Sequence, residues 1–153
     1  MAPEALPAQG VLRDGRHLFP IRVYFEDTDF TGIVYHANYL RFIERARTEM
    51  LRDLGFHQGA IHAGETADAL FFVVARMQLE FLRPARMDDL LTVETQPLRI
   101  SAAAIELEQI VRRDADILFT AKVLIAALAD GKPRRLPREI RNKLELGRST
   151  PAP

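Results

Sequence analysis

The chain of 153 residues contains no cysteine. This absence excludes a disulfide framework, a thiolate nucleophile and zinc sites built from cysteine. Serine is almost as scarce, since it occurs only at Ser101 and Ser149. Neither residue lies in the G-x-S-x-G pattern that presents the nucleophile of common serine hydrolases. The composition therefore argues against the two commonest classes of side-chain nucleophile.

An excess of charge of either sign is also missing, because 21 Lys and Arg residues balance 21 Asp and Glu residues. A neutral chain lacks the basic surface of a nucleic-acid-binding protein, so we expect no nucleic-acid partner, and such a surface tolerates self-association. No apolar run is long enough to span a membrane. The first ten residues, MAPEALPAQG, lack the basic and apolar regions of a signal peptide. We therefore expect a cytoplasmic protein.

What the chain does contain suits one globular domain with a substantial core. Hydrophobic residues make up 48 % and charged residues 27 % of its 153 positions. The start of the chain is rich in Pro, Ala and Gly without a period, which predicts a flexible arm over residues 1–18. A single domain is expected over residues 19–146, followed by a C-terminal tail over residues 147–153.

One segment has the spacing of an amphipathic helix. Its apolar residues recur at intervals of three and four, while Arg41, Glu44 and Arg45 occupy the other face. The apolar set is Tyr39, Phe42, Ile43, Ala46, Met50 and Leu54. Gly55 follows as a natural helix terminator, so we predict a long helix over residues 36–54.

Apolar and polar residues alternate in five other segments, which predicts strands. These segments are residues 19–25, 70–82, 90–98, 103–111 and 118–128. A short helix over residues 137–146 is expected to close the chain. This order indicates the α+β class, with the long helix buried against one face of a five-stranded antiparallel sheet. The apolar run LIAALA, residues 124–129, is typical of a central or interface strand.

The loop before the helix, residues 27–32 with the sequence DTDFTG, admits three interpretations. Its two aspartates and first threonine favour turns and helix caps, so a purely structural role is open. A calcium loop would also begin with D-x-D and carry glycine at position six. That pattern then fails, because position five is Thr31 and position twelve is Asn38 where a glutamate is needed.

The third interpretation is an active site. A carboxylate just before a helix start faces the free backbone N–H groups of the first turn, which can hold an oxyanion. Asp29 is then placed to attack a carbonyl or to activate a water, and His36 follows near the predicted helix start. Gly32 permits the backbone bend between them. These parts suit acyl transfer, and the residues alone leave this hypothesis open beside the structural role.

A longer pattern distinguishes between these interpretations. RVYFEDTDFTGIVYHANYLRFIERARTEML, residues 22–51, resembles the 4-hydroxybenzoyl-CoA thioesterase family of hotdog-fold enzymes. Within it, the segment is most similar to the bacterial acyl-CoA thioesterases associated with the Tol-Pal system. LEFLRPARMDDLLTV, residues 79–93, resembles the segment that follows in that family. The resemblance implies a hotdog fold, in which an antiparallel sheet wraps a long helix, and hydrolysis of acyl-CoA to a free acid and CoA.

The resemblance also assigns roles to residues of the motif. Asp29 matches the catalytic carboxylate, as a nucleophile or as a general base for a water. The backbone N–H of His36 matches the donor that polarises the thioester carbonyl, and its ring is a candidate acid, base or orienting group. Positions near the substrate are matched by Tyr35, Asn38 and Gly32. Tyr39 is expected mainly in packing, and no metal or organic cofactor is implied.

Several basic residues are candidates for contacts with the phosphates of CoA. These candidates are Arg76, Arg83, Arg134 and Arg135. A solvated, charged surface is the alternative, and the sequence favours it. His57 and His62 lie five apart without a third ligand, so we expect no metal site. Glu65 is a further loop acid that the intact Asp29 motif makes unnecessary for catalysis.

The predicted protein is an acyl-CoA thioesterase that forms a dimer or tetramer of identical chains, with its site at the dimer interface as the resemblance implies. An acyl carrier protein is the alternative acyl donor. The competing hypothesis is a binding module, linked to the Tol-Pal envelope system, that holds an acyl group or a carrier protein with little turnover. Peripheral attachment to the inner membrane is left open beside a cytoplasmic location. Hydratase chemistry would need an arrangement of Asp and His that this sequence lacks.

Overall fold

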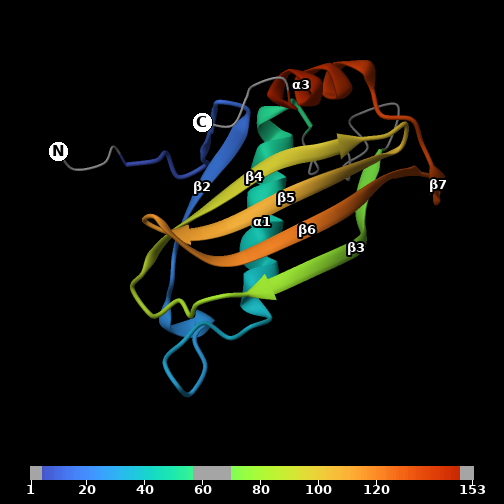
Figure 1. The fold of residues 1–153 in the computed structure, drawn as a ribbon. Coiled ribbons are helices and arrows are strands. Elements are labelled where there is room, and N and C mark those ends of the chain that lie inside the picture. The colour runs from blue at the N-terminus through green and yellow to red at the C-terminus, as the bar shows by residue number, and fades with distance from the viewer. Residues whose placement is uncertain (1–4, 57–69, 149–153) are drawn as a thin grey trace.

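A computed structural model describes residues 5–56 and 70–148, and in these residues one antiparallel sheet wraps a long helix, α1 (Asn38–Asp53) (Figure 1). The strands found in those ranges are β1 (Val11–Arg13), β2 (Arg16–Arg22), β3 (Phe71–Phe81), β4 (Leu90–Ile100), β5 (Ala104–Arg113), β6 (Asp116–Ala129) and β7 (Lys132–Pro133). Their order is β1-β2-β4-β5-β6-β3, and β7 pairs with the end of β6. This is the predicted hotdog fold, with two short strands beyond the five expected.

Helix α1 buries the face that the sequence pattern predicted. All six apolar residues named for that face are at most 6 % exposed. They belong to one core with inward side chains of the sheet, among them Leu91, Leu107 and Val123. Burying a large apolar side chain contributes about 1.5–3 kcal/mol, so this face anchors the helix against the sheet. The helix begins two residues later and ends one residue earlier than predicted.

The same helix also buries an arginine that the pattern did not single out. Arg47 is 5 % exposed, and its Nη1 donates to Oε1 of Gln109 at 2.9 Å. The Gln109 amide in turn donates to the Ile43 carbonyl and to Oγ1 of Thr95, both at 3.0 Å. Burial lowers the pKa of Arg47, while its partner Glu44 opposes that shift. The core under α1 is therefore held partly by a polar network whose members satisfy one another.

The first strands correct the predicted N-terminal arm. β1 and β2 form a hairpin whose turn is Asp14–Gly15, with φ of 50° and 77°. Two consecutive positive φ angles are what a two-residue Asp-Gly hairpin turn requires. β2 continues the sheet by pairing with β4 from His17 to Arg22. The predicted flexible arm is therefore wrong for residues 11–18, which this turn joins to the sheet.

The end of the predicted first strand is also corrected. β2 stops at Arg22, and Phe25 lies in a short 3-10 helix, η1 (Phe25–Asp27), where it is 81 % exposed. Phe25 therefore does not share a buried strand face with Ile21 and Val23, as its alternation predicted. The chain turns here because the carboxylate of Asp27 accepts the backbone N–H of Tyr24 at 2.8 Å.

β3 is one edge of the sheet and β1 is the other, whereas the apolar run at residues 124–129 lies in an inner strand. β6 carries that run and pairs with β5 on one side and β3 on the other. The run thus lies in a central strand, which is one of the two roles predicted for it, and its use at an interface stays a prediction. β3 carries exposed apolar side chains at Phe71, Val73 and Val74. A long apolar edge strand of this kind is usually covered in native proteins.

The last helix, α3 (Arg138–Arg148), confirms the predicted terminal helix and covers the end of the sheet where α1 finishes (Figure 1). Its Lys143 ammonium donates to the carbonyl of Leu54 at 3.3 Å, and Arg141 Nη1 donates to the carbonyl of Ser101 at 3.0 Å. Ile140 and Leu144 are buried in the core. The two ends of α1 therefore differ: α3 packs at its C-terminal end, and a loop precedes its N-terminal end.

Candidate active site

The loop between η1 and α1 is a small hairpin fastened to the segment after β3. Thr28 and Val34 form a bridge at its base, and Ile33 forms a second bridge with Arg86. The Val34 N–H donates to the carbonyl of Ala85 at 2.8 Å. The loop tip thus protrudes beside the end of β3 (Figure 1), and its backbone is set by contacts far apart in the sequence.

Gly32 makes the tight turn of this loop. Its N–H donates to the carbonyl of Asp29 at 3.0 Å, and its φ is +83°. An added Cβ would meet nothing within 4 Å. Glycine is therefore needed here for its left-handed backbone and not for space.

The Asp29 carboxylate is held by one neighbour through one of its oxygens. Oδ1 accepts the backbone N–H of Thr31 at 2.8 Å and the Thr31 hydroxyl at 2.6 Å. These hydrogen bonds, the hydroxyl first, lower the pKa of Asp29, and the backbone N–H of Ile33 and the electrostatic influence of His36 lower it further. Among the described residues, no donor bonds the other oxygen, Oδ2. Asp29 therefore presents an ionised carboxylate with one oxygen oriented and one available.

Asp27, the other acid of the motif, holds the loop together. Besides its side-chain bond to Tyr24, its carbonyl accepts the backbone N–H of Tyr35 at 3.0 Å. The same carbonyl accepts the side-chain amide of Asn38 at 2.8 Å. Asn38, expected near the substrate, thus ties the first residue of α1 to the loop. The side-chain nitrogen of Asn38 therefore has a structural hydrogen bond to Asp27.

His36 lies between the loop and the first turn of α1, with its ring exposed. The Tyr35 ring is 4.4 Å away and tilted, and the Phe81 ring of β3 meets it edge-on at 6.3 Å. Within the described part of the chain, the backbone N–H of His36 has no acceptor, whereas the N–H groups of Tyr35 and Asn38 are both bonded. The amide that the sequence predicted as an oxyanion donor is therefore free to bind an oxygen.

A hollow of about 310 Å³ opens beside His36, with mainly apolar walls. Ile33, Val34, Tyr39, Phe81, Leu82, Arg83 and Pro84 complete its lining. Tyr39 forms its inner wall, stacked on Phe119 at 4.9 Å, and its hydroxyl accepts the N–H of Ala85 at 3.2 Å. Burial raises the pKa of Tyr39, so it stays neutral. The expected packing role of Tyr39 agrees with these contacts.

The four candidate arginines are not brought together within one chain. Arg83 lines the hollow and pairs with Asp116, with Nη1 and Oδ1 at 3.1 Å. Arg76 lies farther back on β3, beside Glu106 and Lys122. Arg134 and Arg135 follow β7, whose Pro133 pairs with Leu128 of β6. Leu128 also pairs with Phe71, which is at the opposite end of β3 from Phe81. Only Arg83 is therefore close to His36 in its own subunit.

Three further residues from the sequence analysis, His57, His62 and Glu65, lie outside the described residues. Over the described ranges, no cluster of three or more His, Asp or Glu side chains is arranged to hold a metal ion. The same ranges contain no helix long and apolar enough to cross a membrane.

Two residues of this site were missed by sequence reasoning. Thr31 entered it only as a mismatch to a calcium loop, yet it bonds Asp29 twice. A threonine two residues after an aspartate is a recognisable Asx-turn pattern, so this contact had a local signal. Phe81 had none, because strand alternation does not tell which side chain of β3 reaches the helix start.

Fold and site together define a class: hotdog-fold proteins with a carboxylate in the loop that precedes the central helix. The sequence model of the family described as Thioesterase superfamily matches residues 31–120. The chain belongs to the thioesterase superfamily.

Individual relatives agree with this assignment. The chain is 43 % identical over 125 residues to the acyl-CoA thioester hydrolase YbgC of Escherichia coli O6:H1. The matched region covers 80 % of this chain and 90 % of that protein. The chain is 42 % identical over 130 residues to the acyl-CoA thioesterase YbgC of Haemophilus influenzae, covering 84 % and 93 %. A solved structure of a probable thioesterase from Bartonella henselae is similar with a TM-score of 0.75 and 49 % identity, over 80 % of this chain and 99 % of that one.

The predictions of this family, of the hotdog fold and of a thioester hydrolase are confirmed by these similarities. The roles of Asp29 and His36, the oligomeric state and the Tol-Pal association are not tested by them and stay predictions.

Proposed function

We propose that this protein hydrolyses acyl-CoA thioesters to a free acid and CoA, with Asp29 as the reacting carboxylate and the backbone N–H of His36 as the oxyanion donor. The observation that carries the proposal is that one loop leaves both groups available, with Asp29 seven residues before His36. Asp29 is kept ionised by Thr31 with Oδ2 available, and the His36 amide has no acceptor among the described residues. The names of the relatives from Escherichia coli and Haemophilus influenzae support the substrate class.

In the proposed reaction, the thioester carbonyl oxygen accepts the His36 N–H at the start of α1. A backbone donor at a helix N-terminus favours the negative charge that develops on that oxygen. Oδ2 of Asp29 then attacks the carbon, or removes a proton from a water that attacks it. The C–S bond breaks and CoA leaves as a thiolate, which needs little help from an acid. In the first route, water hydrolyses the resulting anhydride to regenerate Asp29.

The acyl group is proposed to enter the hollow beside His36. Its volume of about 310 Å³ lies at the lower end of the range for small-molecule sites. Phe81 and Leu82 supply apolar surface on one side, and Tyr39 closes the other. Apolar walls suit an acyl chain or ring, and the neutral Tyr39 adds no charge there.

A homodimer is proposed through the exposed edge of β3. Two copies of an antiparallel edge strand related by a two-fold axis place the end of one strand beside the start of the other. The Phe81 end of β3 in one subunit would then face the Phe71 end in its partner. Arg134 and Arg135 lie near that Phe71 end. The dimer thus offers a route by which these arginines meet CoA phosphates bound at the other subunit's site.

The association with Tol-Pal, the use of an acyl carrier protein, the assembly of dimers into a tetramer and the cytoplasmic or peripheral location remain predictions from the sequence. A binding module with little turnover is the competing function. It differs from the enzyme in what Asp29 does, since a binding module does not need an available carboxylate oxygen.

The test is thiol release from a panel of acyl-CoAs by the wild type, by Asp29→Asn and by Glu26→Gln. Glu26 is an exposed acid of η1, just before this loop, and serves as a matched loss of one negative charge. We expect Asp29→Asn to lose about a hundredfold or more in kcat, the scale of a principal catalytic group, and Glu26→Gln to stay near wild type. Equally slow turnover by wild type and Asp29→Asn on every thioester would support the binding module instead.

A further inference from the structure

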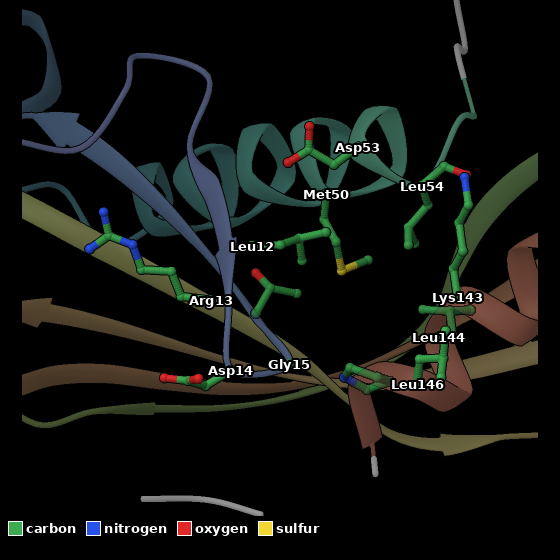
Figure 2. A pocket seen from close by; sticks show the side chains of 12 residues that line it. Leu12, Arg13, Asp14, Gly15, Met50, Asp53, Leu54, Lys143, Leu144 and Leu146 are labelled. Atoms are coloured by element: carbon green, nitrogen blue, oxygen red, sulfur yellow. The ribbon is translucent and has the colours of Figure 1, made fainter. Parts of the chain in front are cut away.

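A second cavity, of about 450 Å³, lies at the opposite end of α1 from His36 (Figure 2). It is lined by residues of the β1–β2 hairpin, the last turn of α1, β4 and α3, and it is open to solvent on one side. α1 has 16 residues, so at 1.5 Å per residue the two ends are about 24 Å apart. The cavity is therefore separate from the proposed active site, and its size is typical of small-molecule sites.

The cavity wall is mainly apolar, and leucine and methionine supply five of its twelve lining residues. Met50, Leu54 and Leu144 are buried and make its floor, whereas Leu12 and Leu146 stand at its rim, 47 % and 72 % exposed. Figure 2 shows these side chains converging from the hairpin, α1 and α3. Protein interiors are normally packed without voids, so an open apolar cavity with leucines at its rim suits an apolar ligand. Met50 can adjust to the ligand's shape because its side chain is unbranched.

Lys143 is the cationic group at the α3 side of the opening. Its ammonium donates to the Leu54 carbonyl at 3.3 Å, and an ammonium has three donors. In the described part of the chain, no carboxylate lies within ion-pair distance of it. Arg13, Asp14 and Asp53 also line the cavity, and Oδ2 of Asp53 lies 3.2 Å from Nε2 of His17. A carboxylate beside Lys143 would gain charge-assisted hydrogen bonds, whereas a cation there would meet a like charge.

We propose that this cavity binds an amphiphilic monocarboxylate, with its apolar tail among Leu12, Met50 and Leu144 and its carboxylate on Lys143. The proposal concerns binding alone and does not depend on the proposed reaction. Its test requires no turnover, so its failure leaves the role of Asp29 untouched.

The test uses three probes with the same ten-carbon chain: decanoate, decan-1-ol and decylammonium. They are titrated into full-length protein labelled with ¹³C at the methionine methyl groups. Met50 lines the cavity, whereas Met87 lies beside Arg86, the residue that bridges to the loop of the proposed active site. We expect decanoate to shift the Met50 methyl signal to saturation while the Met87 signal stays in place.

Two variants test the charged contact. Lys143→Gln should weaken decanoate binding by about tenfold or more, the loss of one charge-assisted contact. Lys132→Gln, the same change at an exposed position in β7, should leave it unchanged. The proposal is overturned if Met50 does not respond to decanoate or if only Met87 responds. It is equally overturned if decan-1-ol or decylammonium binds as tightly as decanoate, or if Lys143→Gln binds like the wild type.

Discussion

Thr31 donates both its backbone N–H and its hydroxyl to a single oxygen of Asp29, at 2.8 and 2.6 Å. The two bonds orient the carboxylate, lower its pKa and leave Oδ2 for chemistry. Gly32 follows Thr31, and its N–H donates to the carbonyl of Asp29, which turns the chain back. The orientation of the Asp29 carboxylate therefore depends on the Thr31 hydrogen bonds and on the turn at Gly32.

Replacing Thr31 by valine should weaken this arrangement without removing the acid. Loss of the hydroxyl bond raises the pKa of Asp29 toward its ordinary value, so protonation begins at a higher pH. We expect kcat/KM to fall by about tenfold at neutral pH and its acid limb to move upward in pH. A pH–rate profile of Thr31→Val measures both effects. Thr28→Val is the matched control, because its hydroxyl donates to the Phe25 carbonyl and not to Asp29; an equal loss there would contradict the role of Thr31.

Gly32→Ala should separate activity from stability. An L-residue at φ +83° is strained by about 1–2 kcal/mol even though its Cβ has space. Gly131 in the β6–β7 turn has φ +74° and equally open surroundings, so Gly131→Ala carries the same strain far from the site. Both variants should lose a similar amount of unfolding free energy in urea titrations. Only Gly32→Ala should also lose kcat/KM, and equal activities would show that the loop turn is not needed.

Breaking the buried network under α1 should destabilise the fold. Gln109→Leu leaves the Arg47 guanidinium, the Ile43 carbonyl and the Thr95 hydroxyl without their partner. We expect a loss of about 2–4 kcal/mol in unfolding free energy, since a buried charge loses a hydrogen bond. Adding Arg47→Met should recover part of that loss, because the buried guanidinium that lost its Gln109 partner is then removed. Urea unfolding of both single variants and the double variant measures the coupling; simple additivity would argue against a shared network.

The buried imidazole of His17 should make stability depend on pH. Burial lowers its pKa below 6.5, and Asp53 and Glu49 on α1 and the Gln9 backbone oppose that shift only in part. The unfolded chain therefore binds a proton more readily than the folded one. Stability is full above about pH 6.5 and falls as the pH drops from there toward the folded pKa. Urea unfolding at pH 7.5 and 5.0 should show a larger decrease for wild type than for His17→Gln, and equal decreases would exclude this cause.

A charge on the β3 edge should separate the proposed subunits. Val74 is exposed on β3, and in a two-fold pairing Val74→Lys would place like charges near each other. We expect light scattering to report a monomer and thiol release to fall, because the proposed CoA contacts come from both subunits. If Val74→Lys stays dimeric and active, the β3 edge is not the dimer interface.

Local sequence patterns were sufficient for most elements of the fold. The spacing of Tyr39, Phe42 and Met50 predicted α1 to within two residues, since a 3.6-residue period has one buried face. The Asp14–Gly15 pair is a recognisable hairpin-turn signal in the sequence. Because this signal was missed, residues 11–18 were wrongly predicted as part of a flexible arm. The error at Phe25 has another cause: alternation continued past β2, but the Asp27 cap ended the strand.

For the site, the sequence predicted the residues that lie close together in the chain and missed one that comes from a distant strand. Asp29, Gly32 and His36 lie within eight positions, so a motif could name them. Phe81 comes from β3, which the fold brings to the helix start by pairing it with β6. Arg134 and Arg135 were candidates by charge alone, and within one subunit they lie at the other end of β3.

By itself, the sequence determined most of the helices and strands, which face of α1 is buried, and the motif that carries the acid and the helix start. These properties depend on neighbours a few positions apart, where period and turn chemistry act directly. Only the tertiary structure decided that β3 is an edge strand, that Phe81 lies beside His36, and that a cavity opens between β1 and α3. Strand order and cavity shape depend on pairing and packing between segments far apart in the chain, which local periodicity leaves open.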